Sequence, residues 1–126
     1  MPAIDDLIPF VHVADVERSL RFYELLGFTV ADTYRLEDRL DWASLESGDA
    51  RLMLAHAHEP VDPARQAVLF YLYADDLQAL HEHLRAHGVP AGEIRDGSPG
   101  PREEMCVRDP DGYVLMIAQT DEPAAR

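Results

Sequence analysis

The sequence predicts an α+β fold in which one unit, a strand followed by a helix and three further strand-like runs, occurs twice along the chain. The first copy begins within residues 7–30 and the second within residues 68–89. Three observations predict it: apolar runs that lead into Asp, apolar residues at helical spacing that end at Gly, and short apolar runs bounded by turn residues afterwards. A duplicated half suggests a site between the halves.

Each predicted helix has a start signal and a stop signal. Asp15 precedes the first helix, and either Asp75 or Asp76 precedes the second; such a side chain accepts hydrogen bonds from the free amides of a first helical turn. Gly27 and Gly88 suit the left-handed residue that ends many helices. Between these signals, apolar side chains recur every three or four residues, which predicts that both helices pack on a sheet. The stripes are Val16, Leu20 and Tyr23, and Leu77, Leu80 and Leu84.

Short apolar runs after each helix are typical of strands. The clearest are Leu52–Leu54, Met105–Val107 and Tyr113–Ile117. Turn residues at 47–49 and 109–112 separate such runs from their neighbours. The sequence therefore predicts strands after both helices, and we expect Cys106, a single cysteine with no internal disulfide partner, to be a buried core residue.

Composition predicts one domain, residues 1–126, built from two modules. Module one covers residues 1–58, a linker without periodicity covers 59–66, module two covers 67–120, and a polar tail that we expect to be loose covers 121–126. The chain is 47% hydrophobic, enough for a core. Halves of about sixty residues are marginal alone, so we expect them to fold together or against a second chain.

The net charge of the chain disfavours some classes of binding partner. With 24 acidic and 11 basic residues the net charge is −13, which repels phosphate backbones and anionic lipid, so we expect neither nucleic acid nor a membrane as partner. The acidity either only confers solubility or attracts a cationic ligand. No run is long enough to span a bilayer and the N-terminus lacks a signal-peptide pattern, so we expect a cytoplasmic protein.

Two segments resemble the signatures of a known family. Val13–Phe28 and Arg108–Leu115 closely resemble those of the vicinal oxygen chelate superfamily, which groups glyoxalase I, extradiol dioxygenases and bleomycin-resistance proteins, and Ala74–Leu77 echoes the first. The resemblance implies tandem βαβββ modules whose mixed sheets curl around a shared cleft. It also implies a homodimer, often with modules exchanged between two chains.

The resemblance also locates four metal-ligand positions. Metal-dependent members carry His or Gln, Glu, His and Glu there, whereas this chain has Ile8, Met53, Leu69 and Met116. Divalent ions need carboxylate or imidazole ligands, and a thioether is a poor substitute. We therefore expect a metal-free cleft of the bleomycin-resistance branch, with no cofactor, no metal site and no catalytic residue.

Two histidine pairs have spacings that could chelate a metal. His83 and His87 lie four apart on what we expect to be the solvated face of the second helix. His56 and His58 share one predicted strand face but run into the linker, without a carboxylate at ligand-like spacing. We interpret neither pair as a metal site.

Strand alternation predicts which side chains line the metal-free cleft, because residues two apart share a face. His12 shares the phase of Ile8 and Phe10, and it is either a ligand contact or an ordinary structural histidine. In resistance proteins of the resembled family an aromatic near the position of Trp42 often walls the pocket. The candidate ligand-binding residues are Ile8, Phe10, His12, Trp42, Met53, Leu69, Tyr71, Tyr73, Glu104, Val114 and Met116.

These observations favour a metal-independent, homodimeric binding protein of the bleomycin-resistance type. It would sequester a cationic or heteroaromatic small molecule in the cleft between modules, since aromatic and methionine side chains suit flat ligands. Carboxylates at the rim would attract the positive charge. The candidates for this role are Asp38, Asp41, Glu46, Glu103 and Glu104.

Two other functions are compatible with the sequence. One is a glyoxalase- or dioxygenase-like lyase, isomerase or oxygenase with a non-standard metal set, or with an acid–base site made by His12 and Glu104. The other is a partner-binding or regulatory module whose cleft is plugged by its own side chains. A metal content near one per chain would favour the enzyme.

Overall fold

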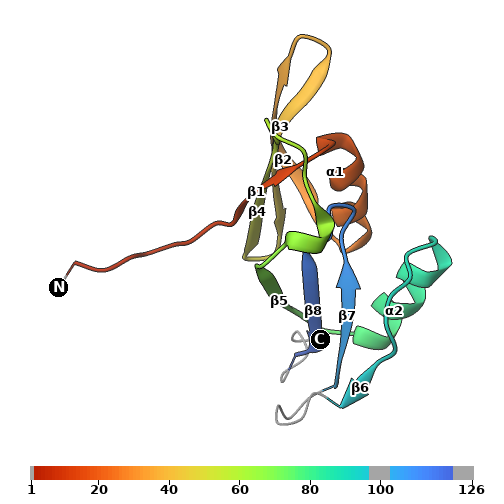
Figure 1. The fold of residues 1–126 in the computed structure, drawn as a ribbon. Helices are drawn as coiled ribbons and strands as arrows, with labels where there is room; N and C mark the ends of the chain where they lie inside the picture. The colour runs from red at the N-terminus through yellow and green to blue at the C-terminus, as the bar shows by residue number, and fades with distance from the viewer. Residues whose placement is uncertain (1, 97–102, 121–126) are drawn as a thin grey trace. The chain divides into compact units, whose positions relative to one another are not determined.

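The computed structural model describes residues 2–96 and 103–120, and the chain divides into two compact units, Met1–Val61 and Asp62–Arg126. Their boundary falls inside the stretch 59–66. Each unit contains a four-stranded mixed sheet and one α-helix (Figure 1). The predicted α+β class with two tandem modules is confirmed, whereas the tail at 121–126 lies outside the described residues.

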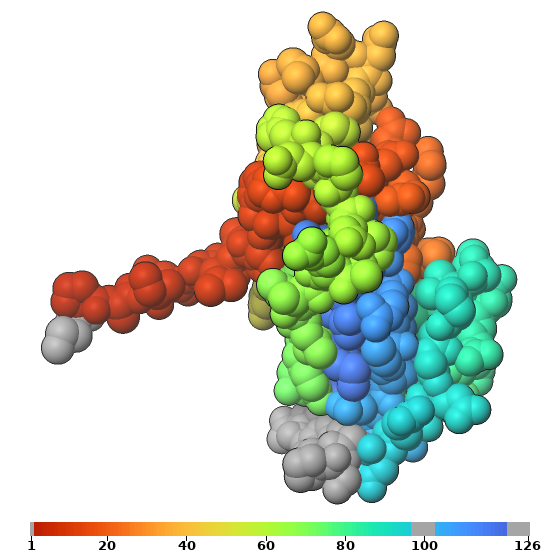
Figure 2. Space-filling view, in the orientation of Figure 1, coloured from red at the N-terminus to blue at the C-terminus, as the bar shows by residue number. Residues whose placement is uncertain are grey.

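Unit 1 has the predicted order of strand, helix and three strands. It comprises β1 (Phe10–Val13), α1 (Val16–Leu25), β2 (Thr29–Leu36), β3 (Arg39–Ser47) and β4 (Ala50–His56). The sheet order is β1-β4-β3-β2, with β1 parallel to β4 and the other neighbours antiparallel. The outer strand β2 is exposed along its length, and Figure 2 shows the turn between β2 and β3 projecting from the rest of this unit.

Unit 2 repeats this topology. It comprises β5 (Leu69–Ala74), α2 (Leu77–Ala86), β6 (Arg95–Asp96), β7 (Glu103–Arg108) and β8 (Val114–Gln119). The sheet order is β5-β8-β7-β6, again with the first strand parallel to the last and the remaining pairs antiparallel. The same order of pairing in both units is the structural counterpart of the repeat predicted from the sequence.

The helix ends follow the capping signals. The Asp15 carboxylate accepts a hydrogen bond from the Arg18 amide at 3.2 Å, and the Asp76 carboxylate accepts one from an amide of the first turn of α2 at 3.0 Å. Asp76 rather than Asp75 is therefore the cap of α2. Gly27 and Gly88 adopt φ of 96° and 83°, the left-handed conformation expected of them.

Each helix covers one face of its own sheet. In α1 the predicted stripe residues Val16 and Tyr23 are buried, and Ser19 and Phe22 are buried as well. The Tyr23 ring meets the Phe22 and Phe28 rings edge-on, with centroids 5.1 and 5.9 Å apart. In α2 the buried side chains are those of Leu77 and Leu84. The strand residues beneath the two helices are also buried: Val11, Val13, Ala43, Leu45, Leu52, Leu54, Met105, Val107, Leu115 and Ile117.

Cys106 does not belong to this core. Its neighbours Met105 and Val107 are almost fully buried beneath α2, but Cys106 is exposed. Successive side chains of a strand point to opposite faces, so a cysteine between two core residues faces away from the core. The expectation of a buried Cys106 was wrong for this reason.

The turn between β7 and β8 packs against the segment at the start of unit 2. The Asp109 carboxylate accepts hydrogen bonds from the amides of Asp111 and Tyr113, each at 2.9 Å. Gly112 has φ of 87°, and a Cβ at this position would lie 2.6 Å from Pro63. Pro63 begins the short 3-10 turn η1 (Pro63–Arg65). The segment before β5 is therefore packed against this turn.

No helix within residues 2–96 and 103–120 is both long and apolar enough to cross a membrane.

We predict that Gly112→Ala lowers the free energy of unfolding by about 2–3 kcal/mol, because alanine is strained at positive φ and its methyl group would collide with Pro63. Gly88→Ala is the matched control in the same unit. It has nearly the same φ, 83°, but no atom within 4 Å of the added Cβ, and should cost about 1 kcal/mol. Urea unfolding of both variants measures the difference; equal losses would show that the Pro63 contact is unimportant.

Candidate functional site

In each unit the helix covers one face of the sheet. We call the opposite face, which the helix of that unit does not cover, the helix-free face. In unit 1 this face carries Phe10 and His12 of β1, whose rings lie 5.4 Å apart. Their neighbours on β4 are Met53 and Ala55, and Trp42 on β3 pairs with Ala55. The predicted lining residues Phe10, His12, Trp42 and Met53 therefore share one face.

The helix-free face of unit 2 carries the predicted residues of β5. Leu69, Tyr71 and Tyr73 are 51%, 51% and 68% exposed. Their register partners on β8 are Val114, Met116 and Ala118, in that order. Large apolar and aromatic side chains thus remain in solvent on the face that alternation assigned to the ligand, while the intervening Leu115 and Ile117 of β8 are buried.

Three of the four metal-ligand positions of the resembled family lie on these strands. Met53 pairs with Phe10, Leu69 opens β5, and Met116 pairs with Tyr71. Ile8 precedes β1, although the sheet ladder continues back to Pro9, whose carbonyl accepts a 2.9 Å hydrogen bond from the Met53 amide. All four side chains are apolar, so these positions offer neither a carboxylate nor an imidazole.

One hydrogen bond crosses the sheet of unit 2. The Tyr71 hydroxyl on β5 donates to the Glu104 carboxylate on β7, across the intervening strand β8. This bond raises the pKa of Tyr71 above its ordinary value of 10.0, and partial desolvation and the negative charge of Glu104 act in the same direction. The Tyr73 ring lies beside Tyr71, with centroids 5.5 Å apart. Phenol, carboxylate and a second ring therefore meet on one surface.

The other proposed rim carboxylates have different surroundings. Glu103 is exposed and, being adjacent to Glu104 in β7, points to the opposite side of the sheet. Asp41 is paired with Arg39 at 3.1 Å, and Glu46 is exposed on β3. Glu104 differs from them because it accepts a hydrogen bond from Tyr71, a residue of the predicted lining.

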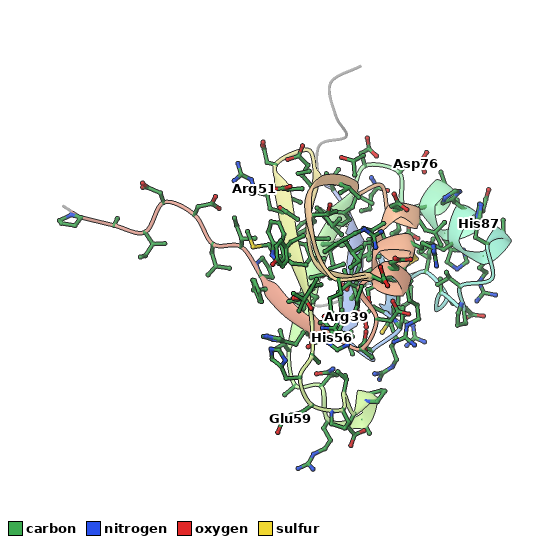
Figure 3. All side chains as sticks on the ribbon, turned by 90° about the horizontal axis from the view of Figure 1, so that it is seen from above. Arg39, Arg51, His56, Glu59, Asp76 and His87 are labelled. Carbon is green, nitrogen blue, oxygen red and sulfur yellow. The ribbon has the colours of Figure 1, made fainter. Side chains whose placement is uncertain are left out.

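A separate depression of about 380 Å³ lies at the start of α1, outside the predicted lining. Arg39 and His56 both border it, and Figure 3 shows them close together. The Nδ1 atom of His56 is buried and has no hydrogen-bond partner within the described part of the chain. The depression is lined by Ala14, Asp15, Val16, Glu17, Asp38, Arg39, Leu40 and His56.

The two histidine pairs lie in different surroundings. His83 on α2 and His87 at its C-terminal cap are exposed with ring centroids 4.4 Å apart, and a ring nitrogen of His87 bonds to the His83 carbonyl at 2.8 Å. β4 ends at His56, so His58 lies beyond it, and the prediction that both share one strand face was wrong. Across residues 2–96 and 103–120, no three or more His, Cys, Asp or Glu residues gather as a metal would require.

Sequence reasoning missed two residues of the helix-free faces. Tyr34 is 57% exposed on β2 and pairs with Trp42 on β3. Cys106 pairs with Met116 on β8. Alternation could have found Cys106, because it shares the phase of Glu104; Tyr34 was missed because the run 29–36 mixes polar and apolar residues without a strict period.

Comparison with known proteins assigns the family. The model of the Glyoxalase/Bleomycin resistance protein/Dioxygenase superfamily matches residues 7–117. The chain therefore belongs to this superfamily, as its two signature segments indicated. The comparison with curated protein sequences found no match.

The solved structures similar to this chain include several that are described as antibiotic-related. A bleomycin-binding protein complexed with bleomycin is 23% identical with a TM-score of 0.75, covering 94% of this chain and 100% of that one. A bleomycin resistance determinant encoded on the transposon Tn5 is 25% identical, with a TM-score of 0.69 and coverages of 94% and 100%. TnmS3, an antibiotic binding protein from Streptomyces sp. CB03234, is 23% identical, with a TM-score of 0.76 and coverages of 96% and 100%. These likenesses establish the shared fold.

We predict that Tyr71 ionises above its ordinary pKa of 10.0. The neutral phenol donates to Glu104, so the stabilisation it provides is fully present below pH 10 and is lost as the pH rises through the raised pKa of the folded protein. Absorbance at 295 nm, compared between the protein and Tyr71→Phe, isolates this transition. Glu104→Gln should lower the transition toward pH 10, and Glu103→Gln should not; no difference between the two variants contradicts the assignment.

Proposed function

We propose that this protein is a metal-independent small-molecule binding protein of the bleomycin-resistance type, which sequesters a cationic or heteroaromatic compound without transforming it. We further propose that it acts in the cytoplasm as a homodimer. The observation that carries the proposal is the pair of helix-free faces, where aromatic and methionine side chains surround positions that in metal-dependent relatives hold the metal.

The identity of those positions supports binding rather than metal-assisted catalysis. Ile8, Met53, Leu69 and Met116 offer hydrocarbon and thioether groups, which favour flat apolar ligands and adapt to irregular shapes. Polarising a substrate carbonyl would require a Lewis acid that apolar side chains do not hold. The cleft between modules implied by the resemblance stays a prediction, which the ligand titration below tests.

The charge of the chain supports a cationic ligand. A net charge of −13 attracts cations over long range and accelerates their association, more so at low salt. The solved structures reported above include a protein named for binding bleomycin and one named as an antibiotic binding protein. A similar compound is therefore the first ligand to test.

The homodimer is proposed on the size of the units and their exposed surface. Units of about sixty residues bury too little surface to be very stable alone. Large apolar side chains outside the proposed lining, namely Ile4, Leu7 and Val68, are more than half exposed in the single chain. A second copy would cover part of this exposed area. Sedimentation equilibrium measures whether the protein forms a dimer in solution.

We predict that bleomycin quenches or shifts the fluorescence of Trp42, the chain's single tryptophan, and that the signal saturates at a fixed stoichiometry. Treatment with EDTA should leave the dissociation constant unchanged, and raising the salt concentration should weaken binding because exposed charges are screened. Trp42→Phe provides the control for the optical signal, with binding followed instead by the rise in melting temperature.

Two experimental results would contradict the proposed function. Binding that EDTA abolishes and added Zn²⁺, Mn²⁺ or Fe²⁺ restores would show a metal site. Release of a chemically altered product would make the glyoxalase- or dioxygenase-like enzyme the correct function.

A further inference from the structure

The sheet of unit 2 places two tyrosines and one carboxylate in adjacent rows of its helix-free face. Tyr73, Ala118 and Glu104 form one row, because Ala118 pairs with Tyr73 on one side and with Glu104 on the other. Tyr71, Met116 and Cys106 form the next row. The Tyr71 hydroxyl leaves its own row and reaches Glu104 in the first.

Ala118 makes this crossing possible. It lies between the strands that carry the two partners, and its side chain is almost fully buried, with 2% exposure. A methyl group leaves space above the central strand, whereas a longer side chain would stand between the phenol and the carboxylate. The hydrogen bond therefore depends on a small residue at this position.

The hydrogen bond restrains the Glu104 side chain but leaves other acceptor sites of its carboxylate available. An ionised carboxylate has two oxygens and about four acceptor sites, of which the Tyr71 hydroxyl occupies one. A bond to a fixed donor restricts the rotamers of the glutamate, so less conformational entropy is lost when a ligand binds. Tyr71 thus acts as a positioning residue, and Glu104 keeps acceptors for a cation.

The two aromatic rings supply the other half of a cation site. Tyr71 and Tyr73 are exposed, with ring centroids 5.5 Å apart and planes inclined by 47°. The face of an aromatic ring attracts cations, alkylated ammonium and guanidinium groups above all, because these are weakly hydrated. A carboxylate beside two inclined rings is the combination that such groups prefer.

We propose that Tyr71, Tyr73 and Glu104 form a subsite for an organic cation, an alkylated ammonium or guanidinium group. This deepens the proposed function, on which it rests, by assigning the positive charge of the ligand to unit 2. The aromatic part of the same ligand extends over Met116, which pairs with Tyr71, and over Val114, which pairs with Leu69 in the next row of that face.

Arg95 is the one positive side chain paired in register with Glu104. The structure records no ion pair between them in the described part of the chain, and Glu104 instead accepts a hydrogen bond from Tyr71. As a cross-strand neighbour, Arg95 nevertheless repels an incoming cation. Removing its charge should therefore strengthen binding, which gives the proposal a test with the opposite sign.

The test uses two soluble probes of equal shape: choline, which carries a trimethylammonium group, and 3,3-dimethylbutan-1-ol, its neutral counterpart. Chemical-shift titration of the backbone amides measures both affinities on the whole protein. We expect choline to bind more tightly and to shift resonances in β5, β7 and β8. Glu104→Gln should weaken choline about tenfold, Tyr73→Leu about threefold, and Tyr71→Phe about threefold, each with little effect on the alcohol.

Glu103→Gln is the matched control, since it removes the same charge one residue away on the opposite side of β7. It should change choline affinity less than twofold, and Arg95→Gln should increase it. Equal effects of Glu103→Gln and Glu104→Gln, or equal binding of choline and the alcohol, would overturn the subsite.

The bleomycin titration separates this inference from the proposed function. If bleomycin binds the protein and both Glu104→Gln and Tyr73→Leu equally well, the subsite is wrong and the function stands. If choline follows the expected pattern and bleomycin does not bind, the subsite stands and the bleomycin-type function fails. Loss of bleomycin affinity in Glu104→Gln, but not in Glu103→Gln, supports both.

Discussion

The structure depends on one constraint: each four-stranded sheet has a single helix to cover it. A sheet has two faces, and side chains alternate between them, so one helix can bury only half of the strand residues. Val11 and Leu115 lie on the buried side, and Tyr71 on the other. The exposed aromatic residues are therefore not scattered, because the topology of each unit collects them on one face.

The two units repeat this geometry but differ in chemistry. In unit 1 the helix-free face offers Phe10, His12 and Trp42. In unit 2 it offers a tyrosine pair and the Glu104 carboxylate, which is hydrogen-bonded to Tyr71 across the intervening strand β8. A duplicated fold can thus present an aromatic surface from one unit and a charge-recognising surface from the other, since only the outward residues need to differ while the buried ones keep the fold.

The helix ends and the strand faces could be predicted from the sequence, because helix capping and side-chain alternation depend on residues close together in the chain. Asp15, Gly27 and Gly88 marked the helix ends. The in-phase residues of β1 share one face of the sheet of unit 1, and those of β5 and β8 share one face of the sheet of unit 2. Strand order is not local. That β8 lies between β5 and β7, and so brings Tyr71 to Glu104, follows from pairing that no short segment encodes. Cys106 was misplaced because its apolar character was given more weight than its phase.

The exposure of the Tyr71 and Glu104 pair affects how a ligand would be held. In water, a hydrogen bond between exposed groups contributes little, since solvent competes for both partners. A flat ligand lying over Met116 would exclude that water, and the attraction between Glu104 and a cation would then act through a lower local dielectric. Apolar area and charge would reinforce each other, because the area that covers the site strengthens the ionic contact. A bare small cation would cover nothing, so the proposed site would favour molecules that combine a positive group with a planar ring.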